Sequence, residues 1–137
     1  MHTKRFLILQ KLNEKLANIP NVQAVYSQIE LPIDRSEVPA INISWSNENY
    51  ELFGDDITRI NNLNLTISII CRGENWQEQS DLISLDMHTI LIKISDSITD
   101  IYQIFKKSTT IEQHIADTTC GVLSHEYVIK YYDNINN

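Results

Sequence analysis

Ser84, Asp86 and His88 come nearest to a catalytic group in this chain, because serine, aspartate and histidine are the residue types of hydrolytic triads. The pattern around them predicts a helix, in which each residue turns about 100° from the one before. Ser84 and His88 then share one face, whereas Asp86 lies about 200° from each of them. A triad requires three converging side chains, so we expect no catalytic residues here.

The glycines of this sequence do not form a ligand-binding motif. Gly54, Gly73 and Gly121 lie far apart, each at a predicted turn, whereas a phosphate-binding loop needs clustered glycines. The chain also lacks the G-x-S-x-G and H-E-x-x-H motifs of α/β-hydrolases and zinc proteases. We therefore predict a protein without enzymatic activity.

The groups that could bind a metal are isolated from one another. Cys71 and Cys120 fall on separate strand-like segments, where free cysteines pack as small apolar side chains. His125 falls on the apolar face of the predicted last strand, where we expect a packed, hydrogen-bonded histidine. Asp55 and Asp56 are adjacent, but no further ligand converges on them. We expect no metal site and no cofactor.

Composition places the chain among ordinary globular proteins, with 137 residues, 42% hydrophobic and 21% charged. We expect a single domain over residues 1–137, with its core at about 4–132 and a flexible tail at 133–137. The net charge of −7 and the scattered basic residues argue against specific nucleic-acid binding, which needs clustered Lys and Arg. No apolar run approaches the roughly 18 residues that cross a bilayer. The start of the chain does not resemble a signal peptide, so we expect a cytoplasmic protein without membrane contact.

The segment from Leu63 to Cys71 is the clearest element of the sequence, because apolar and polar residues alternate over its whole length. This period of two, rich in β-branched side chains, predicts a strand with one buried face. One-sided burial is typical of antiparallel sheets. We expect other strands beside this one and helices on its apolar face.

Periodicity and turn signals predict the other elements in the order α-β-β-β-α-(α)-β-β. The predicted elements are a helix at 4–18, strands at 22–29, 40–45 and 63–71, a helix at 76–94, a short helix after Ser97, and strands at 111–117 and 121–132. This order predicts an α+β domain: a mostly antiparallel sheet of about five strands with helices packed on one face.

The buried faces of the two long helices also follow from spacing. In the first helix the residues that recur at three and four are Phe6, Leu9, Leu12 and Leu16. In the second helix, Leu82 and Leu85 widen an apolar stripe that includes Ile83 and Met87. We expect both stripes to face the sheet.

The connection between the second and third predicted strands, residues 46–57, is the most irregular part of the sequence. It is longer than the two to five residues of a plain hairpin, so we expect it to protrude. It carries Tyr50, Leu52 and Phe53 among four acidic residues. These apolar residues either fold back onto the domain edge or contact a partner.

The whole order of segments resembles the phage tail terminator family, the minor tail proteins that cap the tail tube of long-tailed phages and prophages. The segments that carry the resemblance are Ile19-Pro20-Asn21-Val22, Val38-Pro39-Ala40-Ile41-Asn42-Ile43, Arg59 with Leu63-Asn64-Leu65-Thr66-Ile67, Asp81-Leu82 with Leu85-Asp86, and Tyr127-Val128-Ile129-Lys130-Tyr131. The resemblance covers about residues 4–132.

The resemblance implies a non-enzymatic virion assembly protein that forms a hexameric ring on the last ring of the tail tube. Such a ring ends tail polymerisation and presents the head-joining surface. The implied partners are other copies of the chain, the tail tube protein and the head-side connector protein. The implied location is the bacterial host cytoplasm during assembly and then the head-proximal end of the virion tail.

A group of residues on and around the 46–57 connection is assigned by position to subunit or tube contacts, since interface hot spots favour Trp, Tyr and Arg. The group consists of Trp45, Tyr50, Leu52, Phe53, Asp55, Asp56 and Arg59. Two alternatives stay open: another head–tail joining or tail-completion protein, and a small acidic inhibitor or immunity-type protein that binds a basic partner.

Overall fold

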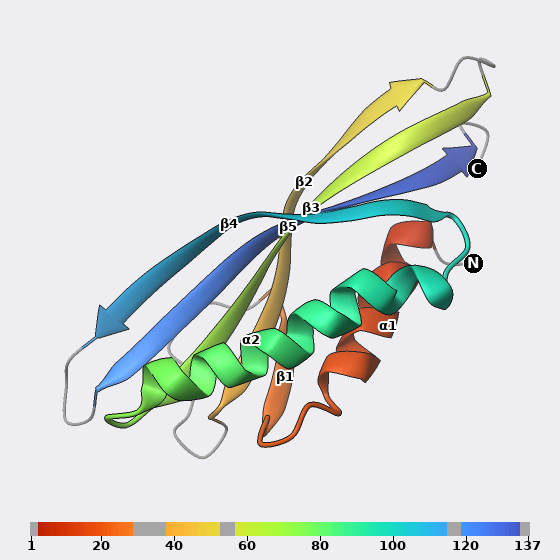
Figure 1. The fold of residues 1–137 in the computed structure, drawn as a ribbon. Coiled ribbons are helices and arrows are strands. Elements are labelled where there is room, and N and C mark those ends of the chain that lie inside the picture. The colour runs from red at the N-terminus through yellow and green to blue at the C-terminus, as the bar shows by residue number, and fades with distance from the viewer. Residues whose placement is uncertain (1–2, 29–37, 53–56, 115–118, 135–137) are drawn as a thin grey trace.

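The computed structural model describes residues 3–28, 38–52, 57–114 and 119–134, which form one five-stranded sheet with helices on one face (Figure 1). Along the sheet the strands follow the order β1-β2-β3-β5-β4. β1 is parallel to β2, and every other neighbouring pair is antiparallel. The strands are β1 (Ala24–Ser27), β2 (Ala40–Leu52), β3 (Thr58–Arg72), β4 (Ile101–His114) and β5 (Cys120–Asn134). The predicted α+β fold is confirmed.

β3 is the central strand, and its alternation is the one that the sequence predicts. The five alternate residues from Leu63 to Cys71 are almost completely buried on the helix side of the sheet. β2 and β5 pair with β3 along nearly its whole length. The apolar face of β3 therefore forms the middle of the core.

Helix α1 (Lys4–Leu16) begins at Thr3, whose hydroxyl accepts a hydrogen bond from the backbone N–H of Phe6 at 3.1 Å. The helix buries Ile8, Leu12 and Leu16. The predicted buried face is therefore wrong for Phe6, which is 45% exposed. Phe6 lies about 200° around the helix from Ile8. Because Ile8 and Leu12 face the core, Phe6 points outward.

Helix α2 (Trp76–Lys93) has nearly its predicted bounds and packs on β3 and β5. Its buried stripe includes Trp76, Ile83 and Met87. Leu82 and Leu85 were expected to widen this stripe but are exposed. Both lie on the side of α2 that no described element covers. None of the helices in the described residues is long and apolar enough to cross a membrane.

β4 replaces the short helix predicted after Ser97. A single 3-10 turn, η2 (Ile94–Asp96), ends the helical segment, and β4 begins at Ile101. Two register shifts, at Ile101/Gln103 and Lys106/Ser108, interrupt the alternation of this strand. Because each shift moves the apolar residues by one position, the spacing of two is lost in the sequence.

β2 and β3 likewise extend into the connection that was expected to be a protruding loop. β2 continues through Leu52 and β3 begins at Thr58, so residues 46–52 are strand. A register shift between Trp45 and Asn47 hides the alternation of β2 in the same way. At the other end of the chain, β5 continues through Asn134, two residues into the predicted tail.

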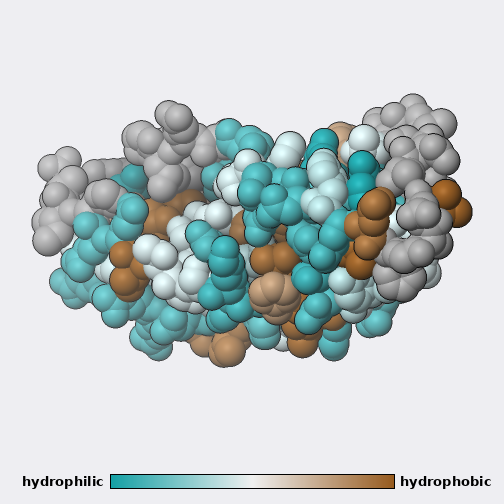
Figure 2. Space-filling view, turned by 90° about the horizontal axis from the view of Figure 1, so that it is seen from above, coloured by the Kyte–Doolittle hydropathy of each residue, from teal (hydrophilic) through white to brown (hydrophobic). Residues whose placement is uncertain are grey.

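The strongly twisted sheet is longer than the helix layer. Figure 1 shows the ends of β2, β3 and β5 running past the start of α1, and the β4–β5 pair running past the start of α2 at the other end. Seen from above, the molecule is elongated and mainly hydrophilic, with its apolar side chains in separate small groups (Figure 2). The two projecting ends of the sheet carry the surfaces described below.

Candidate assembly surface

The candidate surface lies on the end of the sheet that projects past α1. The register shift at Trp45/Asn47 places Trp45, Glu48 and Tyr50 on one side of β2, opposite Leu65, Leu63 and Asn61 of β3. The shift leaves Ser46 as an extra residue in β2, a β-bulge. Without it, Trp45 and Tyr50 would point to opposite faces, because five positions separate them. The bulge therefore gathers side chains that the sequence pattern separates.

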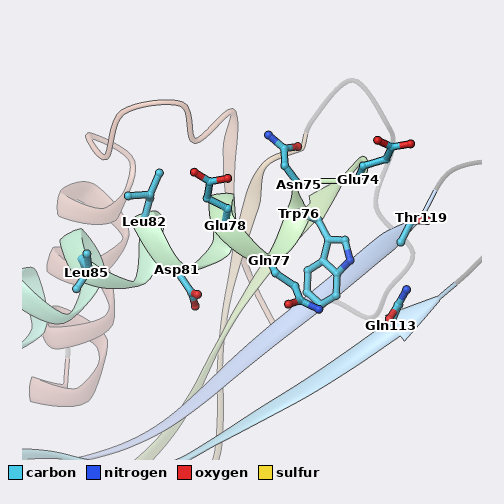
Figure 3. A pocket seen from close by; sticks show the side chains of 10 residues that line it. All are labelled: Glu74, Asn75, Trp76, Gln77, Glu78, Asp81, Leu82, Leu85, Gln113 and Thr119. Atoms are coloured by element: carbon cyan, nitrogen blue, oxygen red, sulfur yellow. The ribbon is translucent and has the colours of Figure 1, made fainter.

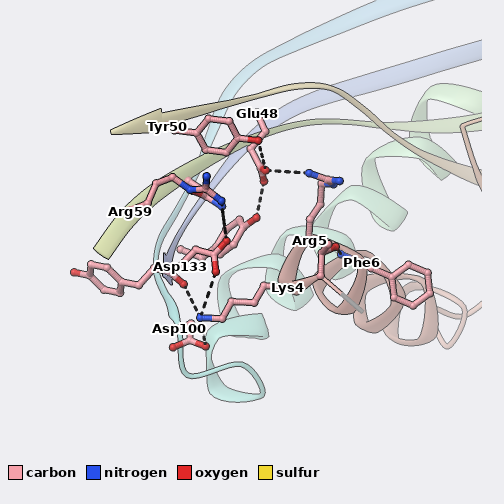
Figure 4. Close-up of polar contacts among 12 residues, drawn as sticks. Lys4, Arg5, Phe6, Glu48, Tyr50, Arg59, Asp100 and Asp133 are labelled. Atoms are coloured by element: carbon pink, nitrogen blue, oxygen red, sulfur yellow. Dashed lines mark hydrogen bonds and ion pairs between the residues drawn. The ribbon is translucent and has the colours of Figure 1, made fainter. Parts of the chain in front are cut away.

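Glu48 is the centre of the first group of contacts (Figure 4). Its side chain is only 3% exposed and accepts three hydrogen bonds. Arg5 of α1 donates to Oε1 at 3.0 Å, and the Tyr50 hydroxyl donates to the same oxygen at 3.2 Å. The Tyr131 hydroxyl of β5 donates to Oε2 at 2.6 Å. Burial, as the main cause, raises the pKa of Tyr131, so this tyrosine stays a donor.

Asp133 of β5 is the centre of the second group. Arg59 donates to its Oδ2 at 3.1 Å, and the Asn61 amide donates to the same oxygen at 3.2 Å. Lys4 lies 4.0 Å from Oδ1 and donates to the backbone carbonyl of Tyr132 at 3.0 Å. Three strands and the start of α1 are thus connected through two carboxylates (Figure 4).

Two guanidinium groups of this network stack on aromatic rings. Arg5 lies 4.4 Å from the ring centroid of Trp45, and Arg59 lies 4.3 Å from that of Tyr50. Each arginine therefore combines an ion pair with a cation–π contact, which holds its planar group in one orientation. This arrangement fixes Trp45 and Tyr50 before any partner binds.

Two large side chains at the outer edge of this end are exposed to solvent. Tyr50 is 53% exposed and Leu52, opposite Arg59 in the register, is 63% exposed. The described part of the predicted group, Trp45, Tyr50, Leu52 and Arg59, thus lies together on one side of the sheet. The remaining members, Phe53, Asp55 and Asp56, lie outside the described residues.

The sequence analysis missed the residues that hold this surface in place. Glu48 had no distinguishing feature in the sequence, since its side of the strand depends on the bulge. Asp133 was assigned to the tail, and Lys4 and Arg5 received no role beyond their place in the predicted first helix. One signal was present: α1 has two basic residues and no acidic residue in its first turn, which the helix dipole disfavours. Two basic side chains at the start of a helix are expected to pair with carboxylates from another element.

Ser84 and His88 share a face of α2, as predicted, and both contact β5. Ser84 Oγ lies 2.9 Å from His125 Nε2, and His88 Nδ1 lies 3.2 Å from the Tyr127 hydroxyl. The Ser84 hydroxyl donates to the carbonyl of Ser80 at 2.8 Å, so its proton points away from His125. With the hydroxyl in this orientation, the Nε2–H of His125 is the donor to Ser84 Oγ.

His125 is a packed histidine, as the sequence analysis expected. It is 4% exposed, and its Nδ1 lies 3.0 Å from the Thr109 hydroxyl. Burial is the main cause that lowers its pKa to about 4, with smaller contributions from Lys106 and His88. Within the described residues, no group of three or more His, Cys, Asp or Glu side chains is arranged to hold a metal ion.

The comparisons with known proteins relate this chain to others through its fold. No protein-family model and no curated protein matches the sequence. Among solved structures, 36 chains match it. One belongs to the structure described as "Virion of native gene transfer agent (GTA) particle", with a TM-score of 0.50, 11% identity, and coverage of 90% of this chain and 91% of that chain. At this identity, the match shows a shared fold.

Proposed function

We propose that this chain is a structural protein of a phage-like particle, without enzymatic activity. The support is that its fold matches a chain of a gene transfer agent virion over nearly the full length of both chains. The described surface fits this role, because its ordered groups are suited to recognition. The Ser84–His125 contact elsewhere in the fold has a threonine hydroxyl, not a carboxylate, at Nδ1 of the histidine.

We further propose that the chain caps the tail tube as a hexameric ring, ends tail polymerisation and presents the head-joining surface. The observation that carries this proposal is the arginine–aromatic array at the projecting end of the sheet. It consists of Arg5 stacked on Trp45 and Arg59 stacked on Tyr50. Arg59 is held by Asp133 and Tyr50, beside the exposed Leu52, as in an interface hot spot that is ordered before binding. The residues assigned to subunit or tube contacts are Trp45, Tyr50, Leu52, Phe53, Asp55, Asp56 and Arg59.

The test uses the tail tube protein encoded by the same genome, polymerised in vitro with and without this chain. We expect the wild-type chain to bind tube ends and to shorten the tubes, as measured by negative-stain electron microscopy. Arg59→Ala should weaken end binding about tenfold or more, because it removes both the ion pair and the stacking contact. Arg59→Lys should restore binding poorly, because an ammonium group cannot reproduce the planar stacking.

Lys15→Ala is the matched control, because it removes one basic side chain from the last turn of α1, away from the array. It should leave end binding unchanged. If Arg59→Ala, with its fold verified by circular dichroism, binds tube ends as the wild type does, the assignment of the array is wrong. If the wild-type chain binds portal or connector rings instead of tube ends, the chain is another head–tail joining protein.

A further inference from the structure

One long edge of the sheet, the outer side of β4, has no neighbouring strand in the described part of the chain. β4 pairs with β5 on its other side. Residues 108–113, which follow the second register shift, are all exposed. They contain no Pro or Lys, the residues that commonly protect an edge strand from pairing. Figure 3 shows Gln113 of this segment on the far side of β5 from α2, so the helix does not cover this edge.

The second open edge belongs to the later half of β2. β1 pairs with β2 at residues 40–43. Beyond β1, the Gln28 side chain accepts from the Trp45 N–H at 2.6 Å and donates to the Trp45 carbonyl at 3.4 Å. No described strand lies beside residues 47–52 on the side opposite β3. The sheet therefore has two unlike open edges, one on β2 and one on β4.

The backbone groups at these two edges point outward at residues that can be identified. The N–H and C=O of a strand residue point to one edge or the other according to its face, and this rule reverses between antiparallel strands. Trp45, on the helix side, directs both groups outward, so Tyr50 and Leu52 on the same side of β2 do as well. Because β4 runs opposite to β2, its helix-side residues Thr109 and Ile111 direct theirs to the outer edge of β4.

The side chains along the two edges also match face by face. On the helix side, Tyr50 and Leu52 of β2 are 53% and 63% exposed, and Ile111 of β4 is 55% exposed. On the other face, both segments are polar, with Asn49 and Thr110 near their middles. Pairing the two edges keeps each residue on its own face, so apolar side chains meet on one face and polar ones on the other.

We propose that residues 108–113 of β4 in one copy pair with residues 47–52 of β2 in the next copy. Head-to-tail copies keep their strand directions, and β4 runs opposite to β2, so this pairing is antiparallel. The two edges differ, so the contact is heterologous, the kind that closes into a ring. The two segments lie at opposite ends of the sheet, which staggers successive copies as the strands of a closed barrel are staggered. The inference rests on the proposed function, since it names the subunit contact of the proposed ring.

The first experiment places charges in the middle of both edges in the full-length chain. The lysine variant carries Asn49→Lys and Thr110→Lys, and the glutamate variant carries Asn49→Glu and Thr110→Glu. Both positions are exposed, so the core is unchanged. Each variant alone brings like charges together at every contact, so self-association should weaken about tenfold or more, as measured by sedimentation velocity at low salt. An equimolar mixture should regain assembly, because alternating copies bring opposite charges together.

Gln103→Lys and Gln103→Glu are the matched controls, since Gln103 is an exposed residue on the same face of β4 but precedes the paired segment. They should leave self-association unchanged. A control that weakens assembly as much as the paired substitutions do, or a mixture that does not reassemble, would overturn the contact. A wild-type chain that stays monomeric up to about 1 mM would overturn it as well.

Amide hydrogen exchange tests the backbone pairing itself. On assembly of the wild-type chain, the N–H groups of Tyr50, Leu52, Thr109 and Ile111 should exchange about tenfold more slowly or less, as measured by mass spectrometry with electron-transfer fragmentation. The N–H of Thr110 points to β5 in both states and should not change. Protection that appears only after the tube protein is added would show that the tube protein pairs with these edges, and the contact between copies would be wrong.

The two proposals fail in different ways. Lysine and glutamate variants that still cap tubes with wild-type affinity, while their mixture does not reassemble, overturn the edge pairing and leave the capping function intact. A wild-type chain that does not bind tube ends, while the two variants assemble only when mixed, overturns the capping function and supports the contact between copies.

Discussion

At the scale of single residues, the buried carboxylate of Glu48 and its hydrogen-bond donors hold one end of the sheet together. Glu48 is nearly inaccessible to solvent and is stabilised by donors from α1, β2 and β5. A buried carboxylate without partners would be strongly unfavourable, so these donors are required by the burial itself. The consequence is a surface whose arginine and aromatic groups are ordered in the free chain.

Glu48→Gln tests this account of the network. The amide keeps the size of the side chain but loses the charge that pairs with Arg5 and accepts from Tyr131. We expect the free energy of unfolding to fall by about 1–3 kcal/mol, as measured by urea denaturation. Glu51→Gln is the control, because Glu51 is an exposed residue of the same strand and should change stability by less than about 0.5 kcal/mol. Equal effects of the two substitutions would contradict a structural role for Glu48.

His125 predicts a specific dependence of stability on pH. Its pKa in the folded protein is lowered to about 4 from an ordinary value of 6.5, mainly by burial. The unfolded state therefore binds the proton first as the pH falls. The stability that the neutral imidazole contributes is complete above about pH 6.5 and is lost progressively down to about pH 4, by up to roughly 3 kcal/mol.

The measurement compares wild type with His125→Gln by urea denaturation from pH 7.5 to pH 4. Other groups titrate in both proteins, so the informative quantity is the difference between the two free energies of unfolding. This difference should shrink as the pH falls. A difference that stays constant over the range would show that the histidine titrates alike in the folded and unfolded states.

At the scale of elements, β-bulges and one close helix–strand contact decide how the strands and helices pack together. The bulge in β2 places Trp45 and Glu48 on the same side, and the two register shifts in β4 adapt the edge strand to the twisted sheet. At the start of α2, the ring of Trp76 packs directly on Gly121 of β5. The absence of a side chain at residue 121 allows the helix to approach the sheet there.

Gly121→Ala tests this close approach. A Cβ atom at residue 121 would overlap the six-membered ring of Trp76, so the helix start must shift. We expect a loss of about 1–3 kcal/mol of unfolding free energy, as is typical of overpacked cores. The double variant Gly121→Ala/Trp76→Leu should lose less than the sum of the two single variants, because the leucine leaves room for the methyl group. Additive losses would show that the two residues do not conflict.

At the scale of the whole molecule, the chain presents two different surfaces at opposite ends of one sheet. The arginine–aromatic array lies at the end near the start of α1, and a groove lined by Glu78, Asp81 and Leu85 lies at the end near the start of α2. A sheet in which every strand pairs with its neighbour, beneath helices that share its core, connects the two. A partner that binds one end of the sheet therefore contacts the same packed unit that carries the surface at the other end.

The prediction of a single domain belongs to this scale. The main core cluster includes residues from both helices and from β2, β3, β4 and β5, so these elements should unfold together. We expect one calorimetric transition whose van't Hoff enthalpy equals the calorimetric enthalpy. Two transitions, or a van't Hoff enthalpy well below the calorimetric one, would show that the chain unfolds in separate parts.

The sequence alone determined the class of the fold and the elements with regular periods. The alternation from Leu63 to Cys71 and the stripe that includes Ile83 and Met87 identified β3 and α2, because a long uninterrupted period allows one secondary structure only. The same reasoning placed His125 on a buried face. These properties depend on neighbouring residues in the chain, so the chain itself carries the information.

Only the tertiary structure decided which side chains meet. The register shifts in β2 and β4 are set by pairing with strands distant in the sequence, and each one moves every later side chain to the other face. The exposure of Leu82 and Leu85 depends on which side of α2 packs on the sheet. Glu48, Tyr131, Asp133 and Arg5 come from three separate elements, so no local pattern predicts their contacts. The candidate surface and the groove are both products of that packing.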